Sequence, residues 1–271
     1  MDLLSKEKYD INDLVEIVKI LRSPEGCPWD KVQTHETIRK DFIEEVYEAV
    51  EAIDEKDTEH LREELGDVLL QVVFHSVLEN EQEHFTFDDV TDEVCRKMII
   101  RHPHVFGNID ANTTEEVLKN WDEIKMQTHS QKTVSEAMNS VCKTLPSLMR
   151  AEKLQKKAKR GGIYPQNTDE VFNEINDKLE TLKSVITVED STLQQEKIGE
   201  LLFSVVKLSG ITNTDCEQSL YNACEKFTEQ FKAYEKAAVQ KGVNIQDSDT
   251  DVTNQLWKEI SKKEKIGGKL K

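Results

Sequence analysis

The chain has 271 residues, a length that allows one large domain or two small ones. It carries 53 acidic against 36 basic residues, a net charge of -17, so it lacks the basic surface that a nucleic-acid polymer requires, and we expect no such partner. The 5 cysteines form no CxxC motif, and no segment is apolar enough for export or for a membrane span. We therefore expect a cytoplasmic protein with reduced thiols and no membrane partner.

The first predicted element is an amphipathic helix from Asn12 to Leu21, whose apolar residues recur at helical spacing. It stops before a turn that contains Pro24 and Gly26. The loop that follows carries Trp29 and Lys31, a large aromatic side chain close to a cation. Taken alone, Trp29 could simply cover one end of a helical bundle.

Two acidic helices are predicted next, from about Thr37 to Asp54 and from Glu59 to Asn80, with Thr58 as the expected N-cap of the second. Each carries an apolar stripe and two carboxylates spaced i, i+3, which places both carboxylates on one face of the helix. The two pairs are Glu45 with Glu48 and Glu64 with Asp67. Because a short connection makes the helices antiparallel neighbours, the four carboxylates can face one another.

Four converging carboxylates cannot all stay ionised without a counter-charge, which hard divalent cations bound by oxygen supply. We expect Mg²⁺, with Mn²⁺ as the alternative. The carboxylates could instead be solvated faces of acidic helices, but two pairs on adjacent helices, each set in an apolar stripe, favour a metal site. A helical di-iron site would need Glu-x-x-His motifs from two helices, and the chain offers only Glu81-x-x-His84.

Thr86 and Asp89 open another predicted helix, which runs to Arg101 and ends before Pro103. It carries Lys97 and Arg101 at i, i+4, so both cations point the same way. They are either a solvated basic edge or a clamp on phosphate oxygens, for which a guanidinium group is suited.

A capping box of Thr113 and Glu116 predicts one more helix, with Trp121 and Lys125 at i, i+4. Trp121 alone is most simply a core residue, and Lys125 beside it could reach a phosphate.

The remaining histidines are interpreted as structural. His102-Pro103-His104 is read as a turn rather than a metal-binding pair, because the acidic helices already supply an oxygen site. His35 and His75 lie near apolar positions, where a satisfied structural histidine is expected.

From about residue 128 to 165 the composition becomes polar and then basic, which predicts a connector with a helix closed by Gly161 and Gly162. The segment after it repeats the acidic helices: VFNEINDKLE resembles DFIEEVYEAV, and QEKIGELLFSVV resembles REELGDVLLQVV. The expected organisation is an N-terminal domain of residues 1–127, the connector 128–165 and a C-terminal domain of residues 166–271.

The register of this repeat decides what the second half can do. The aligned pairs are Glu45 with Glu174, Glu48 with Asp177, Glu64 with Lys197, Asp67 with Glu200, Lys97 with Lys226, Arg101 with Gln230, Trp121 with Trp257 and Lys125 with Ser261. The second half thus keeps its apolar positions but loses one carboxylate and two cations. We predict that its motif is degenerate and its role structural.

These motifs together resemble the MazG family of nucleoside triphosphate pyrophosphohydrolases. EExxE followed by EELGD matches the family's metal-binding signature, and the flanks GCPWDKVQTH, LLQVVFH and RHPHVFG match as well. The resemblance covers nearly the whole chain, because two-domain members continue with a connector like LPSLMRAEKLQKKA and a second MazG-like half. Some members use that second half for catalysis, a pattern from which this sequence departs.

The resemblance implies an all-α fold of two tandem MazG-like helical domains, with four-helix-bundle-type cores completed by dimerisation. A single helix pair cannot bury both of its faces, so a homodimer is also expected on physical grounds. The implied activity is hydrolysis of a nucleoside triphosphate, NTP or dNTP, between the α- and β-phosphates, which serves nucleotide-pool housecleaning. The alternative is a helical interaction protein that keeps the scaffold and binds nucleotide with little or no turnover.

The resemblance also assigns roles to residues. Glu45, Glu48, Glu64 and Asp67 would hold two or more Mg²⁺ ions, which bridge phosphate oxygens and lower the pKa of the attacking water. Glu44 would orient or deprotonate that water, or add a further ligand. The residues expected at the substrate are Trp29 and Lys31 near the base, Lys97, Arg101 and Lys125 on the phosphates, and Trp121 at the base or ribose.

Overall fold

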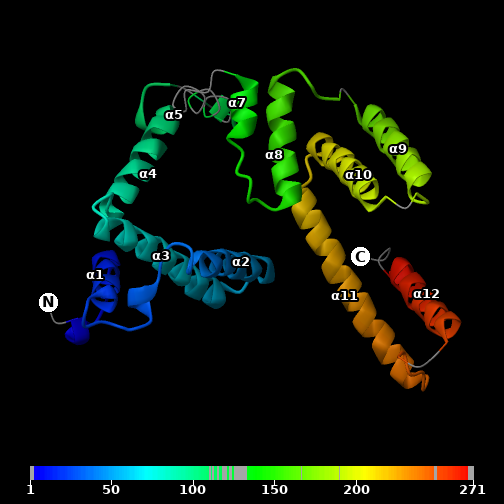
Figure 1. Ribbon diagram of the computed structural model, residues 1–271, viewed down its shortest axis with the longest axis horizontal. Helices are drawn as coiled ribbons and strands as arrows, with labels where there is room; N and C mark the ends of the chain where they lie inside the picture. Colours follow the sequence, from blue (N-terminus) through cyan, green and yellow to red (C-terminus); the bar gives the residue numbers. More distant parts are fainter. Residues whose placement is uncertain are drawn as a thin grey trace. The chain divides into compact units, whose positions relative to one another are not determined.

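The computed structural model divides into two compact units, Met1–His129 and Ser130–Lys271, and each is described by itself (Figure 1). The structure describes residues 3–109, 111, 113, 114, 116, 117, 121, 124, 133–165, 167–188, 190–246 and 249–267, with side chains as far as residue 261. Throughout these residues the regular structure is helical and no strand occurs, which confirms the all-α prediction. Of the helices so described, none is long and apolar enough to cross a membrane.

The helices of the first unit agree closely with the periodicity of the sequence. They are η1 (Leu3–Ser5), α1 (Ile11–Arg22), η2 (Asp30–Val32), α2 (Arg39–Glu55), α3 (Thr58–Glu81), α4 (Phe87–Arg101) and α5 (Pro103–Phe106). As predicted, Thr86 caps α4 through a capping box with Asp89, and α4 ends before Pro103. The segment from His102 to His104 forms the start of α5, a short helical turn with Pro103 in its first position.

One predicted cap is wrong. The N-cap of α3 is Asp57, not Thr58, because the Asp57 carboxylate accepts the backbone N–H groups of Glu59 and His60 at 3.1 and 3.0 Å. A carboxylate at this position satisfies two otherwise unpaired donors and also suits the positive end of the helix dipole. Lys56, just before it, adopts a left-handed conformation with φ of 60° and closes α2, so the chain reverses within a few residues.

The core of the first unit forms where α1 and α2 both pack along α3. Its buried members are Val18, Ile38, Val73, Phe74, Val77 and Leu78. Arg22 fastens the η2 loop to this core, since its guanidinium donates to both carboxylate oxygens of Glu81 at 2.7 Å and to the carbonyl of Asp30 at 2.6 Å. The loop that carries Trp29 is therefore anchored to α1 and α3.

The second unit begins with helices from the segment expected to be a connector. Its helices are α7 (Val134–Asn139), α8 (Ser147–Arg160), α9 (Thr168–Val185), α10 (Ser191–Thr212), α11 (Cys216–Gln240) and α12 (Thr250–Gly267). The basic helix α8 packs on α10 and α11, so it belongs to the second unit's own packing. Gly161 and Gly162 close α8 as predicted, with φ of 80° at Gly162.

The two units share a helix order and a pattern of packing. In the first unit α1 packs on α3 and α2 lies along α3; in the second, α8 packs on α10 and α9 lies along α10. Val171 of α9 and Val206 of α10 are almost fully buried where these helices meet. The helix pair α9–α10 is thus the structural counterpart of α2–α3, as the repeat in the sequence indicates.

Candidate metal and nucleotide site

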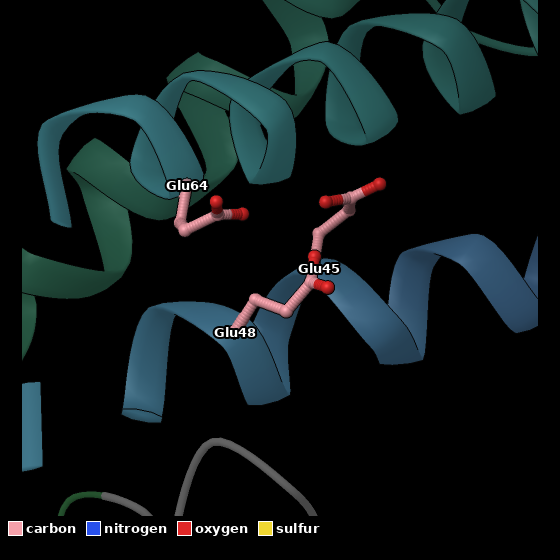
Figure 2. A group of neighbouring side chains, drawn as sticks. All are labelled: Glu45, Glu48 and Glu64. Atoms are coloured by element: carbon pink, nitrogen blue, oxygen red, sulfur yellow. The ribbon is translucent and has the colours of Figure 1, made fainter. Parts of the chain in front are cut away.

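The antiparallel pair α2–α3 brings carboxylates from both helices together. Small residues on α2 allow the close approach, since Ala49 and Ala52 are buried against α3. Glu45 and Glu48 from α2 and Glu64 from α3 each offer an oxygen, and these oxygens all lie within 4.8 Å of one another. Figure 2 shows the three side chains extending into the space between the two helices. We call this group the carboxylate cluster.

Glu64 is the most buried member of the carboxylate cluster, with 7% of its surface exposed. Its Oε1 lies 3.0 Å from Nε2 of His60, one turn earlier on α3. Its Oε2 is buried and has no hydrogen-bond partner among the described residues. A buried carboxylate oxygen without a protein partner is costly unless an ion or water binds it, so this atom is suited to be a cation ligand.

The electrostatics of Glu45 lead to the same conclusion. Burial raises the pKa of the Glu45 carboxyl, and the negative charges of Asp67, Glu48 and Glu64 raise it further. Carboxylates that raise one another's pKa in this way form a site whose ionised state requires a counter-cation. Hard cations such as Mg²⁺ and Mn²⁺, which prefer carboxylate oxygens, fit this set of donors.

Two further acidic residues predicted for this site lie at its edge. Asp67 is outside the group of three oxygens within 4.8 Å, although its charge acts on Glu45. Glu44 is exposed and lies 3.7 Å from the ammonium group of Lys40, one turn away on the same face of α2. The structure therefore brings together three of the predicted carboxylates, with Asp67 near them and Glu44 directed elsewhere.

Trp29 and Lys31, the two substrate residues predicted around η2, differ in their exposure and contacts. Trp29 immediately precedes η2 and leaves 59% of its surface exposed, so its ring can be reached from solvent. The ammonium group of Lys31 donates to the carbonyl of Pro24 at 2.6 Å and thereby closes the loop on itself. Gly26 is required there, because a Cβ would lie 2.3 Å from the carbonyl oxygens of Ile20 and Leu21.

Of the two cations predicted on α4, Arg101 contacts an aromatic ring. The guanidinium carbon of Arg101 lies 5.5 Å from the ring centroid of Trp121, a cation–π contact. Lys97, one turn earlier on α4, is exposed. Figure 1 shows α4 leaving the end of α3 and running away from α2. Lys125 lies outside the described residues.

Contacts made by His35 and by two histidines of α3, His60 and His75, were not predicted from the sequence patterns. His35 and His75 stack with their rings 2° from parallel and their Nδ1 atoms 2.7 Å apart, and His35 Nε2 also contacts Glu79 at 2.7 Å. Nε2 of His75 is buried with no partner in the described structure, so the prediction of a satisfied histidine holds for only one of the two ring nitrogens of His75. Burial, and then the charge of His35, lowers the pKa of His75. His60 was not singled out, although its i, i+4 spacing from Glu64 was visible in the sequence.

The residues considered for a di-iron site are engaged in other contacts. Glu81 is bound by Arg22 through both oxygens, and Nδ1 of His84 contacts Glu79 at 2.7 Å. These contacts agree with the rejection of that alternative.

The counterpart site on α9–α10 is closed by lysines. Both oxygens of Glu174, the counterpart of Glu45, accept from Lys207 at 2.6 and 2.7 Å. Glu200, the counterpart of Asp67, accepts from Lys178 at 2.5 Å and from Lys197 at 2.8 Å. These hydrogen bonds lower the pKa of Glu200 to about 2. Ammonium groups therefore occupy the neighbourhood that a cation would need.

The counterparts of the substrate residues also differ from the first unit. Trp257 packs with Phe227, Phe231 and Tyr234 in an aromatic cluster of α11 and α12 that includes buried Leu256. Its role there is to stabilise the helix pair. With Gln230 and Ser261 at the positions of Arg101 and Lys125, the second unit lacks the matching cations.

Comparison of the sequence with known protein families identifies a matching family model. Residues 33–106 match the family model of the MazG nucleotide pyrophosphohydrolase domain. This segment includes α2, α3 and α4, and therefore every member of the carboxylate cluster.

Curated proteins match over much more of the chain. A nucleoside triphosphate pyrophosphohydrolase/pyrophosphatase MazG of Thermotoga maritima is 39% identical over 245 residues, which is 90% of this chain and 93% of that protein. A nucleoside triphosphate pyrophosphohydrolase of Escherichia coli K12 is 35% identical over 94% of this chain and 98% of its own length. The uncharacterized protein YabN of Bacillus subtilis is 36% identical over 95% of this chain, which corresponds to 53% of YabN.

Proposed function

The chain belongs to the family of MazG nucleotide pyrophosphohydrolases, and from this premise we propose that it hydrolyses nucleoside triphosphates between the α- and β-phosphates. One water is consumed, and a nucleoside monophosphate and pyrophosphate are released. The names of the relatives from Thermotoga maritima and Escherichia coli support this class of substrate. Because nucleoside triphosphates form a cytoplasmic pool, we expect the enzyme to act in the cytoplasm.

The carboxylate cluster is the observation that carries the proposal. Three carboxylate oxygens within 4.8 Å, one of them from a buried residue with an unpartnered Oε2, suit a hard divalent cation. We propose that Glu45, Glu48 and Glu64 hold Mg²⁺, that Asp67 completes the set, and that Mn²⁺ can substitute. When bound, such a cation neutralises phosphate charge and makes water more acidic.

The remaining roles fall to residues of the chain itself. Glu44 is adjacent to Glu45 in sequence, and for this reason we assign it to orienting or deprotonating the attacking water. This role requires its exposed side chain to leave Lys40 and turn towards the cluster. Lys97 and Arg101 bind phosphate oxygens and neutralise the charge that develops on them, with Lys125 as the third cation. Trp29 and Trp121 contact the base or ribose, and Lys31 shapes the loop around Trp29 through its contact with Pro24.

The test is release of pyrophosphate from ATP, dCTP and dUTP by the full chain, with Mg²⁺, with Mn²⁺ and with EDTA. We expect release with either metal and none with EDTA. If no triphosphate yields pyrophosphate with either metal while nucleotide still binds, the alternative function holds: the chain keeps this scaffold and binds nucleotide without hydrolysing it. Release of inorganic phosphate instead of pyrophosphate would contradict the α–β cleavage.

We further propose that the protein is a homodimer. An apolar stripe on α2 is exposed in the single chain, at helical spacings i, i+3, i+4, i+7 and i+10. It consists of Ile43, Val46, Tyr47, Val50 and Ile53. Leu65 and Leu69 on α3 are also exposed. A stripe of this kind is unfavourable in water and is typical of a helix that completes a bundle with a partner.

Helix α4 supports the same proposal. It packs against the end of α3 and against α5, and it exposes Val94, Met98, Ile99 and Ile100. The helix itself runs from the end of α3 away from α2 (Figure 1). We propose that α4 packs on the α2–α3 pair of the partner, which would bring Lys97 and Arg101 to the partner's carboxylate cluster.

Val50→Glu tests the dimer, because it places a charge in the centre of the α2 stripe. Light scattering after size exclusion should then report a monomer, and pyrophosphate release should fall with it. Lys19→Glu is the control, since it introduces the same side chain at an exposed position of α1, a helix that the proposed interface does not include. A folded Val50→Glu variant that keeps the mass of the parent would exclude the stripe from the interface.

A further inference from the structure

His60 contacts the most buried member of the carboxylate cluster without belonging to the cluster itself. Its Nε2 lies 3.0 Å from Oε1 of Glu64, whereas Oε2 of the same carboxylate is buried and has no hydrogen-bond partner among the described residues. The imidazole is partly exposed at the surface of α3, and Glu64 is buried. The two oxygens of Glu64 therefore have different environments, and the imidazole engages one of them.

The start of α3 fixes the position of His60. The carboxylate of Asp57, the N-cap, accepts the backbone N–H of His60 at 3.0 Å. Side chains on an α-helix lean towards its N-terminus, so Glu64 lies over the preceding turn, where residue 60 is its i−4 neighbour. The contact between His60 and Glu64 thus follows from the helix and its cap, and it forms without the closure of any loop.

The second unit has lost this histidine together with the carboxylate that it contacts. In the register of the repeat, Lys197 stands at the position of Glu64, and Leu193 stands at the position of His60. Lys197 donates instead to Glu196 and Glu200, at 2.7 and 2.8 Å. The helix pair therefore forms without a hydrogen-bond donor at this position, which separates the role of His60 from that of a packing residue.

A donor on one oxygen of a carboxylate favours one orientation of the whole group. A glutamate side chain has three rotatable torsions, and ordering them costs conformational entropy when a cation binds. Carboxylates that bind metals are themselves hydrogen-bonded by partners that do not touch the metal, and these partners orient the ligand. An imidazole with its proton on Nε2 can act in this way on Oε1 and leaves Oε2 for the cation.

We propose that His60 is a positioning residue of the metal site, which donates from Nε2 to Oε1 of Glu64 and so directs Oε2 to the cation. The inference rests on the proposed function, because it takes the carboxylate cluster as a site for a divalent cation. It assigns His60 no contact with the metal, the substrate or the reacting atoms.

The test is the affinity of the full chain for Mn²⁺ alone, measured at one pH and without nucleotide from the electron paramagnetic resonance signal of free Mn²⁺. Because the chain carries 53 acidic residues, binding at the cluster is defined as the binding that Glu64→Gln removes. We expect His60→Leu to weaken this binding by about 10–100-fold, the loss typical when a hydrogen-bonding partner of a metal ligand is removed. The Mn²⁺ concentration that gives half-maximal pyrophosphate release should rise as well.

Two other substitutions of His60 separate positioning from packing. His60→Gln places an amide N–H near the position of Nε2 and should restore most of the Mn²⁺ affinity, whereas the shorter amide of His60→Asn should not. Leucine is a strong helix former, so His60→Leu should keep α3 folded. Urea denaturation of each variant checks this, since a merely structural role would change the free energy of unfolding and leave the Mn²⁺ affinity unchanged.

His84→Leu is the matched control. It removes a histidine whose Nδ1 lies 2.7 Å from the Glu79 carboxylate, a contact of the same kind outside the cluster. Its Mn²⁺ affinity should equal that of the parent, and an equal loss in His84→Leu and His60→Leu would show that the effect is not specific to Glu64.

Three further results would overturn the inference. These are unchanged Mn²⁺ affinity in folded His60→Leu, tighter binding in that variant, which would show that His60 competes with the cation for Glu64, and binding by His60→Gln as weak as by His60→Leu. A parent that binds no Mn²⁺ at the cluster contradicts the metal site and this inference together. If the variants differ as expected but the parent releases no pyrophosphate, only the proposed function is contradicted.

Discussion

The residues of the carboxylate cluster are partly or fully buried, and all of them carry a negative charge when ionised. Glu64 is buried with one oxygen unpartnered, and the pKa of Glu45 is raised first by burial and then by three neighbouring carboxylates. A buried polar group left without a partner costs about 1–3 kcal/mol, and more when it is charged. A protein without a metal role would gain stability by replacing these residues, so their presence supports a ligand set rather than a packing requirement.

We predict that Glu48→Ala or Glu64→Ala abolishes turnover, because each removes a proposed metal ligand. The expected fall in kcat is on the order of 10²-fold or more. Glu51→Ala is the control, since Glu51 is exposed on α2 one turn from Glu48. Circular dichroism establishes that each variant is folded. A kcat close to that of the parent in either folded variant would remove that residue from the ligand set.

Arg101→Ala tests the phosphate clamp. We expect a higher KM and a lower kcat, with kcat/KM reduced by about 10–100-fold, as for loss of a hydrogen bond to a charged group. Arg101→Lys should recover part of the loss, because it keeps the charge but not the planar fork. Arg96→Ala is the control on the same helix, since Arg96 is exposed and pairs with Asp92. Unchanged affinity and rate in Arg101→Ala would mean that Arg101 only stacks on Trp121.

Residue spacing predicted some of this site and not the rest. The i, i+3 spacing and the short connection between the two helices were enough to place Glu45, Glu48 and Glu64 together. Helical geometry fixes which side chains share a face, and the short connection makes the helices antiparallel neighbours. The contact of Lys31 with the Pro24 carbonyl and the stacking of His35 on His75 depend on loop conformation and on residues 40 apart in the sequence. Such contacts have no local pattern from which they could be inferred.

The corresponding helix pairs of the two halves differ in the charges that lie between the helices. On α2–α3 the carboxylates face one another, whereas on α9–α10 three lysines stand among them. By the alignment, Lys178 replaces Ala49, Lys197 replaces Glu64 and Lys207 replaces Phe74. The α9–α10 pair is thus held by ion pairs where α2–α3 has a site that needs a cation.

These ion pairs predict a pH dependence of stability. The pKa of Glu200 is lowered to about 2 by its bonds to Lys178 and Lys197, below its ordinary value of 4.5. A carboxylate with a lowered folded-state pKa binds fewer protons when folded, so its contribution is fully present above pH 4.5 and is lost as the pH falls towards 2. Glu200→Gln should therefore flatten the fall in the free energy of unfolding between pH 5 and about 2.5, measured by urea denaturation.

The control for this measurement is Glu180→Gln, which breaks the exposed i, i+3 pair with Lys183. Exposed pairs of this kind contribute little to stability, so its pH profile should follow that of the parent. Parallel profiles for the parent and Glu200→Gln would show that the Glu200 cluster does not contribute to acid sensitivity.

Helix bounds were largely predictable because capping residues and apolar periodicity are local signals. Thr86, Asp89 and the glycines after α8 gave correct ends. The N-cap of α3 was misassigned by one residue because Asp57 and Thr58 are both good caps, and only the backbone conformation chooses between them. The direction of α4 was not predictable, since the i, i+4 spacing of Lys97 and Arg101 fixes their common face but not the helix that this face meets.

For the whole molecule, the repeat identified in the sequence corresponds to two units of equal topology and unequal chemistry. The structure divides after His129, and α8 packs on α10 and α11. A fragment that began at residue 160 would remove α8 and with it the hydrogen bond from Gln155 to the Phe203 carbonyl at 2.7 Å. Fragments that keep each unit intact are therefore residues 1–129 and 130–271.

We predict that turnover resides in the first of these fragments and is absent from the second. In the second unit the counterparts of the metal ligands are engaged by Lys178, Lys197 and Lys207, and each ammonium group repels a divalent cation at short range. Helicity and oligomeric state are measured first, because a fragment that does not dimerise could lose activity for that reason alone. In the full chain, Glu45→Ala should abolish pyrophosphate release, whereas Glu174→Ala should leave it close to that of the parent. The assignment is wrong if residues 130–271 hydrolyse triphosphates while a folded, dimeric 1–129 does not, or if Glu174→Ala costs as much activity as Glu45→Ala.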